Sequence, residues 1–176
     1  MKKIKVILGS TRTNRAGAGV AKWVMSQTQK YIGNLQFDFI DLKDVNLPFL
    51  DEPFPPMMAE EYAHDHTKKW SKIIAEADGF IIVTPEYNHG YPASLKNALD
   101  FLYKEWQDKP VGLVGYGGSG ARSSIKQLRE VLEFMKMKPI KEQVGVGEIW
   151  EAFDEEGNLK VEKVRGDLQV IFNELE

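Results

Sequence analysis

The chain has 176 residues, of which 43% are hydrophobic and 28% are charged. This length and composition indicate one folded domain with a sizeable core, spanning residues 1–176, and leave no residues for a second domain. The net charge is −3 and the Lys and Arg residues are scattered, so we expect no binding to nucleic acid or to an anionic membrane. The expected partners are small molecules or further copies of the same chain.

Cysteine is absent, which excludes disulfides, thiol catalysis and metal or iron–sulfur sites held by thiolates. No stretch approaches ~18 consecutive apolar residues, and the first apolar run, at residues 4–8, is too short for the core of a signal peptide. We therefore expect a cytoplasmic protein without a membrane span. Any redox chemistry would then depend on a bound cofactor.

The first candidate site lies where a buried strand, predicted at residues 4–8, runs into Gly9 and a polar segment, ahead of a helix predicted at 16–31. A helix N-terminus has unpaired N–H groups and a partial positive charge, so a phosphate bound there would be met by backbone amides. The side chains that would add donors are Ser10, Thr11, Arg12 and Arg15. The alternative is that these polar residues only cap the helix or are solvated.

Two nucleotide-binding motifs are excluded in this segment. Gly17-Ala18-Gly19 lies too far beyond the strand for a dinucleotide fingerprint, and Lys22 stands where the third glycine belongs. No Gly-Lys-Ser/Thr follows Gly9 at the spacing of a Walker loop.

A strand is then predicted at residues 35–41, a long Pro-rich loop at 44–58 and a helix at 61–77. His64 and His66 are two residues apart in this helix and would point about 200° from one another. We therefore expect them to be solvated rather than to share an ion, and we expect no metal site.

The second candidate site follows an apolar run at residues 79–83, predicted as a buried strand. The Pro and Gly residues of the next segment, 85–92, keep it out of regular structure, which leaves the backbone groups of residues 86–88 free to bind a flat, polar ligand. Tyr87 and Tyr91 offer ring faces to stack on that ligand. The alternative is a simple connector, because these residue types are common between a strand and a helix.

The remaining predicted elements are a helix at residues 93–106, a strand at 111–116, a Gly-rich turn at 117–120, a helix at 121–137, a strand at 139–146 and a helix at 162–174. In the first of these helices, Leu95, Leu99 and Leu102 suffice to cover a sheet. Its other large side chains are Phe101, Tyr103 and Trp106. Because a second apolar face is usually buried, we expect a homodimer or homotetramer that covers them, with residues 53–58 of a neighbour beside each site. The alternative cover is loop 44–58 of the same chain.

The order of these elements predicts an α/β, flavodoxin-like fold, in which a five-stranded parallel sheet of order 2-1-3-4-5 carries helices on both faces. The loops after the first, third and fourth strands would then meet at the carboxyl edge of the sheet. Flavodoxins bind FMN at this position.

These loops carry Gly9-Ser10-Thr11-Arg12, and residues 85–92 and 95–100 read PEYNHGYP and LKNALD. In these motifs, and over about residues 4–145, the chain resembles the NADPH-dependent FMN reductase family, which includes quinone, azo-dye and chromate reductases. The resemblance implies non-covalent FMN, reduced by NADPH or NADH, and acceptors such as quinones or free flavin. Since one exposed flavin face would serve both substrates, we expect a two-electron, ping-pong reaction.

The resemblance also implies roles for individual residues. Ser10 and Arg12 would hold the FMN phosphate, with Thr11, Arg15 and Gly17 beside them. The residues that would surround the isoalloxazine are Pro85, Glu86, Tyr87, Asn88 and Gly90 at one end and Gly117, Gly118 and Ser119 at the other. Many members have Ser and Asn where this chain has Arg15 and Gly17.

No acid, base or nucleophile of the protein is expected to be catalytic, because the flavin carries the chemistry. We expect the helix at 121–137 to aim its positive end at the flavin edge that gathers negative charge on reduction. Two other functions remain open: a one-electron carrier of the flavodoxin type, and an FMN-binding sensor or interaction module. Carriers of that type are usually strongly acidic, whereas this chain has a net charge of −3.

Overall fold

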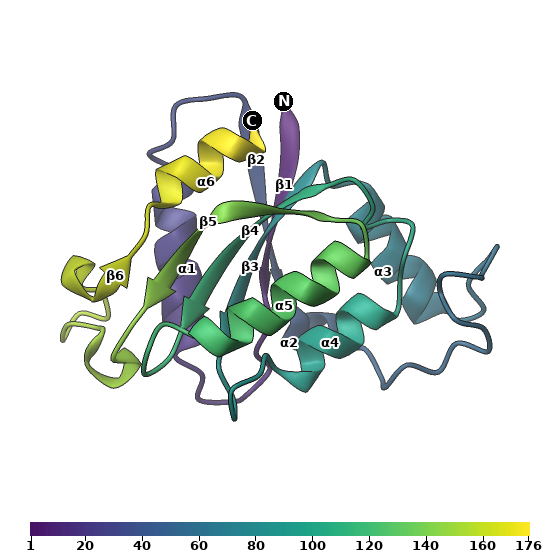
Figure 1. The fold of residues 1–176 in the computed structure, drawn as a ribbon, viewed down its shortest axis with the longest axis horizontal. Coiled ribbons are helices and arrows are strands. Elements are labelled where there is room, and N and C mark those ends of the chain that lie inside the picture. The colour runs from purple at the N-terminus through teal and green to yellow at the C-terminus, as the bar shows by residue number, and fades with distance from the viewer.

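A six-stranded sheet in the order β2-β1-β3-β4-β5-β6 runs through the computed structural model, which describes all residues from 1 to 176 (Figure 1). The strands are β1 (Lys2–Leu8), β2 (Leu35–Asp41), β3 (Gly79–Pro85), β4 (Pro110–Tyr116), β5 (Lys138–Val146) and β6 (Val164–Arg165). The first five are parallel, and β6 pairs antiparallel with β5. The predicted order 2-1-3-4-5 is therefore confirmed, with one short edge strand added.

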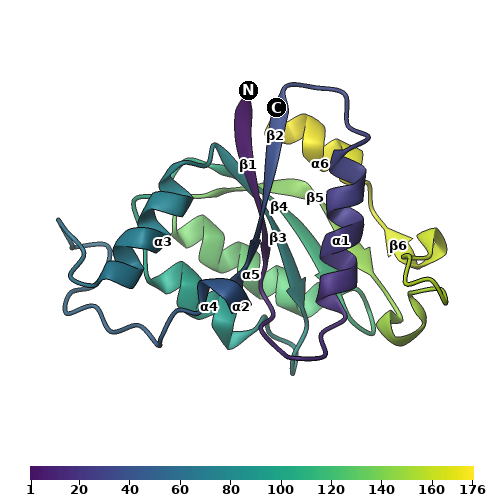
Figure 2. The ribbon, with the colours of Figure 1, turned by 180° about the vertical axis from the view of Figure 1, so that it is seen from behind.

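Helices cover both faces of the sheet, as Figures 1 and 2 show. They are α1 (Gly17–Thr28), α2 (Leu42–Val45), α3 (Asp65–Ala75), α4 (Ala93–Asp100), α5 (Arg122–Phe134) and α6 (Leu168–Leu175). One core cluster joins α1 and α6 to the sheet through residues such as Val20 and Phe172, and a second joins α3, α4 and α5 through Trp70, Leu99 and Leu128. All helix-to-strand loops of the parallel strands thus leave the carboxyl edge of the sheet free for a ligand.

The central strands have no alternation of polar and apolar residues, because helices cover them on both sides. All seven residues of β3 are buried. At the edge of the sheet the pattern changes: Lys5 of β1 is buried and its Nζ lies 2.8 Å from Oδ2 of Asp38 in β2. This hydrogen bond holds the pKa of the Asp38 carboxyl below its usual range.

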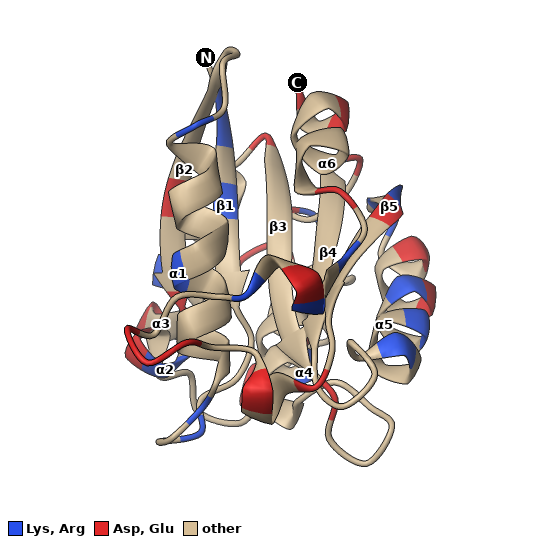
Figure 3. Ribbon diagram, turned by 90° about the vertical axis from the view of Figure 1, so that its left-hand side faces the viewer, with Lys and Arg blue, Asp and Glu red and all other residues tan.

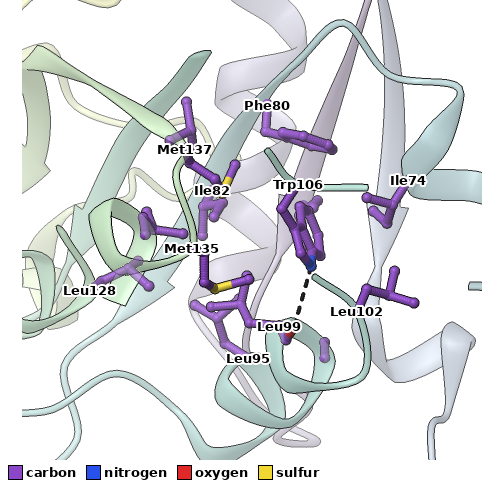
Figure 4. Packing of buried hydrophobic residues seen from close by; sticks show 14 of the residues in the cluster. Ile74, Phe80, Ile82, Leu95, Leu99, Leu102, Trp106, Leu128, Met135 and Met137 are labelled. Atoms are coloured by element: carbon purple, nitrogen blue, oxygen red, sulfur yellow. Dashed lines mark hydrogen bonds between the residues drawn. The ribbon is translucent and has the colours of Figure 1, made fainter. Parts of the chain in front are cut away.

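The prediction for the helix at 93–106 is wrong at its C-terminal end. α4 ends at Asp100, and the following turns lead the chain back to the sheet. Phe101 and Trp106, expected on a second face, are 0% and 1% exposed. The Trp106 indole lies 4.9 Å from the Phe80 ring centroid, and its Nε1 donates to the Leu99 carbonyl at 3.3 Å (Figure 4). The chain's own core therefore covers these two residues.

The helix predicted at 162–174 is also interrupted. Residues Val161–Lys163 form a 3-10 turn, β6 follows, and α6 begins only at Leu168. Gly166 has φ of +89°, and a Cβ there would lie 2.1 Å from the Gln143 carbonyl oxygen. The close approach of Gly166 to β5 is thus what breaks the helical pattern.

The side-chain chemistry of the surface is mixed. Figure 3 shows Lys and Arg interspersed with Asp and Glu along the elements that face the viewer. No helix has the length and apolar character that crossing a membrane requires. No group of three or more His, Asp or Glu side chains is placed to hold a metal ion.

Candidate functional site

The first candidate loop joins β1 to α1 and is fixed against the neighbouring elements. The Gly9 amide donates to the Val83 carbonyl of β3 at 2.9 Å, and the Gly9 carbonyl accepts from the Ser94 hydroxyl of α4 at 2.7 Å. Ser10 is buried, whereas residues 11–14 are exposed. α1 has no side-chain cap at its N-terminus, so its first amides are free to meet an anion.

Ser10 connects the two predicted loops. Its Oγ lies 2.8 Å from the Tyr87 hydroxyl, which belongs to the loop after β3. Thr11 and Arg12 point away from this contact, and Nη2 of Arg12 donates to the Asn14 carbonyl at 3.0 Å. The structure therefore brings Ser10 and Tyr87 together and leaves Arg12 at the rim.

Three buried polar atoms beside Ser10 have no hydrogen-bond partner: Nε and Nη1 of Arg15 and the Tyr116 hydroxyl. Arg15 forms an ion pair through Nη2 with Asp41 at the end of β2. Burial raises the pKa of the Tyr116 hydroxyl, and the nearby guanidinium groups of Arg15 and Arg12 offset this only in part. Unpaired buried donors are rare in folded proteins, so these atoms mark a place where a polar ligand would complete the structure.

Gly17 is required by the same cluster. A Cβ at Gly17 would lie 2.1 Å from the Tyr116 hydroxyl oxygen. Since that distance is far inside van der Waals contact, only glycine lets α1 begin beside Tyr116. The departure of Gly17 from the family pattern therefore has a packing reason in this chain.

The second candidate loop is more ordered than its composition predicts. Tyr87 and Gly90 exchange both backbone hydrogen bonds, at 2.8 and 3.0 Å, and Asn88 and His89 between them have positive φ angles of 50° and 65°. The backbone groups of Tyr87 are thus used inside a tight turn. The expectation that they are free for a ligand is wrong, and the turn instead presents side chains.

Glu86 joins this loop to α5. Its Oε2 accepts from the amides of Ser123 and Ser124 at 2.9 and 3.2 Å, and the Ser124 hydroxyl donates to the Pro85 carbonyl at 2.8 Å. The Gln127 amide donates to the His89 carbonyl at 3.0 Å. A carboxylate therefore already occupies the N-terminus of α5, and the expectation that this helix end points at a flavin is wrong.

The third loop, after β4, runs beside a segment that the sequence patterns did not single out. The Gly117 and Gly118 carbonyls accept from the amides of Ile149 and Glu148 at 3.3 and 3.1 Å. Trp150 is 71% exposed, and a Cβ at Gly118 would lie 3.6 Å from its ring. Ser119 forms an isolated bridge with Gly147 on the same segment. The signal that could have identified Trp150 is a large aromatic residue in a segment otherwise rich in charged residues.

Tyr91, the second ring expected to stack on the ligand, lies elsewhere. It packs against the core on the α4 and α5 face and lines a hollow of about 520 Å³ between these helices and residues 55–57. Loop 44–58 contains α2 at its start and is then held to α4, because Asn97 binds the Pro48 carbonyl and the Leu50 amide at 2.7 and 2.9 Å.

His64 and His66 are closer than predicted. His64 precedes α3 with extended backbone, so the two rings stack with centroids 5.2 Å apart. Both Nε2 atoms approach Asp51, at 3.1 Å from its carbonyl and 2.9 Å from Oδ1. They fasten the loop to α3.

Comparisons with known proteins agree with this arrangement. The family model described as NADPH-dependent FMN reductase matches residues 2–151. An NAD(P)H-dependent FMN reductase of Schizosaccharomyces pombe is 47% identical over 137 residues, covering 77% of this chain and 68% of the relative. An NAD(P)H-dependent FMN reductase of Saccharomyces cerevisiae is 40% identical over 147 residues, covering 78% and 77%. An NADPH:quinone oxidoreductase of Arabidopsis thaliana is 25% identical over 185 residues, covering 99% and 90%.

Among solved structures, a flavoenzyme NAD(P)H:(acceptor) oxidoreductase from Paracoccus denitrificans superimposes with a TM-score of 0.67 at 23% identity, covering 93% of this chain and 88% of the other. This similarity confirms the flavodoxin-like fold. The match of the family model and the identity to the two yeast enzymes confirm the predicted family, and with it an NAD(P)H-dependent reductase. The chain belongs to the NADPH-dependent FMN reductase family.

Proposed function

We propose that the chain binds FMN at the carboxyl edge of its sheet and uses NADPH or NADH to reduce quinones or similar small acceptors. The names of the relatives support this class of reaction. The single observation that carries the site is the cluster of unpaired buried atoms of Arg15 and Tyr116 beside the open N-terminus of α1. A phosphate ester supplies acceptor oxygens for such donors.

The residues present fit FMN. Ser10 and the amides at the start of α1 would hold the phosphate, with Arg15 behind it and Thr11 and Arg12 at the rim. The residues proposed around the flavin ring are Pro85, Glu86, Tyr87, Asn88, Gly90, Gly117, Gly118 and Ser119, with the newly found Trp150 beside Gly118. FMN when bound supplies the two-electron redox chemistry. Gly117 and Gly118 have no side chain to fill the space in front of the loop.

The protein's own contribution is then to position and exclude. Glu86 holds the two ring-side loops together through α5, and the Ser10 to Tyr87 contact closes the phosphate side. No histidine or carboxylate of the cluster is assigned a proton-transfer role. NADPH would leave as NADP⁺ before a quinone enters and takes up two electrons and two protons, so double-reciprocal plots should be parallel.

The test of the binding proposal is a titration of the purified chain with FMN and with FAD, read by flavin fluorescence. FMN should bind more tightly, because the pocket at the start of α1 ends on a helix and suits a terminal phosphate. Arg12→Ala should weaken FMN binding by about 1.5–3 kcal/mol if its guanidinium bonds the phosphate. Lys22→Ala, a matched loss of an exposed cation on α1, should have no effect. Equal or tighter FAD binding would refute the proposal.

The two other functions give different results. A one-electron carrier or a sensor module would also bind FMN, but NADPH would not reduce it. The relatives named as NAD(P)H-dependent reductases favour the enzyme.

We further propose a homodimer through the α4 and α5 face. Four large apolar side chains are exposed there or on the adjoining loop: Phe54 (66%), Met57 (54%), Met58 (76%) and Phe134 (72%). The same surface carries the hollow of about 520 Å³, so one face presents both protruding and receiving apolar groups, as a two-fold interface requires. Light scattering should show a dimer or a dimer of dimers, and Phe134→Glu should give monomers. A wild-type monomer would contradict this proposal.

A further inference from the structure

A polar pocket lies on the far side of the turn that follows β4. Its volume is about 440 Å³ and no hydrophobic residue lines it. Ser119 and Gly120 form one wall, and the segment that leads through β6 forms the opposite wall. Ser119 is also the last residue of the loop proposed to contact the flavin ring, so this pocket adjoins the proposed cofactor site.

Glycine backbone keeps the pocket open. Gly120, Gly145, Gly147 and Gly166 all line it. A Cβ at Gly145 would lie 3.2 Å from the Gly120 carbonyl oxygen, and Gly120 itself has φ of +74°. No side chain therefore projects into the space from these positions.

The pocket has cations that no carboxylate neutralises. Lys163 is paired, because its Nζ lies 2.5 Å from Glu148 and 3.6 Å from Glu151. Arg122 and Arg165 belong to none of the ion pairs of the molecule. The only other charged side chain in the lining is Glu162, which is likewise unpaired.

Arg165 is held in place by the backbone. Its Nη1 donates to the carbonyls of Glu162 and Val164 at 2.7 and 3.0 Å. This leaves Nε and Nη2 for a ligand on a guanidinium whose position is already fixed. A planar guanidinium of this kind suits a phosphate group, which accepts two parallel hydrogen bonds.

We propose that this pocket receives the 2′-phosphate of NADPH, bound by Arg122 and Arg165, and that it gives the enzyme a preference for NADPH over NADH. The inference rests on the proposed function, since the nicotinamide would lie at the flavin ring while the adenosine end reaches past Ser119 into the pocket. The arginine inside the loop after β1 is less suited to this role, because Arg15 is paired with Asp41.

The first test is isothermal titration calorimetry of the FMN-loaded chain with 2′,5′-ADP and with 5′-ADP, which lacks the 2′-phosphate. The 2′,5′-ADP should bind at least tenfold more tightly. Arg122→Gln and Arg165→Gln should each weaken its binding by about tenfold, the lower end for one charged hydrogen bond. Lys126→Gln, one helical turn beyond Arg122 on α5 and also exposed, is the matched control and should leave binding unchanged.

Two further arms separate the proposal from a loss of fold and from a general anion site. Glu162→Gln removes the unpaired negative charge, so it should tighten 2′,5′-ADP binding by roughly threefold, as expected for an exposed charge pair. In steady-state assays, the ratio of kcat/KM for NADPH to that for NADH should fall about tenfold in Arg122→Gln, following the same loss of one charged hydrogen bond.

Equal affinity for 2′,5′-ADP and 5′-ADP would overturn the proposal, as would equally tight binding of inorganic phosphate alone. Indifference of both arginine variants would overturn it as well. A failure of the proposed function is seen separately: the chain would not bind FMN, while titration of the same preparation with 2′,5′-ADP would still report on the pocket.

Discussion

Glu86 makes the sharpest stability prediction, because one carboxylate oxygen serves two backbone amides at the start of α5. Hydrogen bonds to a charged group contribute about 1.5–3 kcal/mol each, and a negative charge at a helix N-terminus adds about 0.3–1 kcal/mol. Because one oxygen shares both donors and Glu86 is half-buried, the lower end applies. We expect Glu86→Ala to lower the free energy of unfolding by about 2–4 kcal/mol, and Glu86→Gln, which keeps an acceptor oxygen, by about 1 kcal/mol.

The assay is equilibrium unfolding in urea, followed by far-UV circular dichroism on the wild type and both variants. Glu133→Ala removes an exposed carboxylate from the other end of α5 and should change the free energy by less than about 0.5 kcal/mol. The Glu86 variants should also lose FMN affinity, since the carboxylate ties the loop after β3 to α5. A Glu86→Ala protein as stable as the control, with full FMN affinity, would refute the reasoning.

Three further predictions concern packing and pH. Gly17→Ala should destabilise the fold because its Cβ would meet the Tyr116 hydroxyl at 2.1 Å, and thermal unfolding should show partial recovery when Tyr116→Phe is added. Trp106→Ala should cost about 3–5 kcal/mol in urea unfolding, because the indole is 1% exposed; a smaller loss would contradict its core position. Asp38 has a pKa lowered by the hydrogen bond from Lys5, so its contribution to stability is complete above the unfolded value of about 3.9 and is lost as pH falls through the lower folded value. Asp38→Asn should remove this part of the pH dependence in urea titrations between about pH 2 and 5, and an unchanged curve would contradict it.

Local sequence patterns predicted the sheet well because its central strands are uniform apolar runs bounded by turn residues. β2 was predicted with its observed ends, Leu35–Asp41, and β3 differs only by two residues at its carboxyl end. The family motifs also predicted which loops meet, since parallel strands bring their carboxyl ends to one edge.

The errors arise where tertiary contacts decide. A helical pattern continued past Asp100, but the indole of Trp106 gains more from burial against Phe80 than from a longer α4. The positive end of α5 invited a flavin, yet Glu86, distant in sequence, reaches it first. Spacing alone could not show that His64 lies before α3, and the contact of Trp150 with Gly118 depends on a segment with no regular pattern.

The most direct test of the account is addition of NADPH to the FMN-loaded protein in the absence of oxygen, followed by a quinone. The account predicts that the visible absorbance of the flavin is lost on addition of NADPH and returns when the quinone is added, with one NADPH consumed for each FMN. A protein whose bound flavin keeps its absorbance with both NADPH and NADH would contradict it.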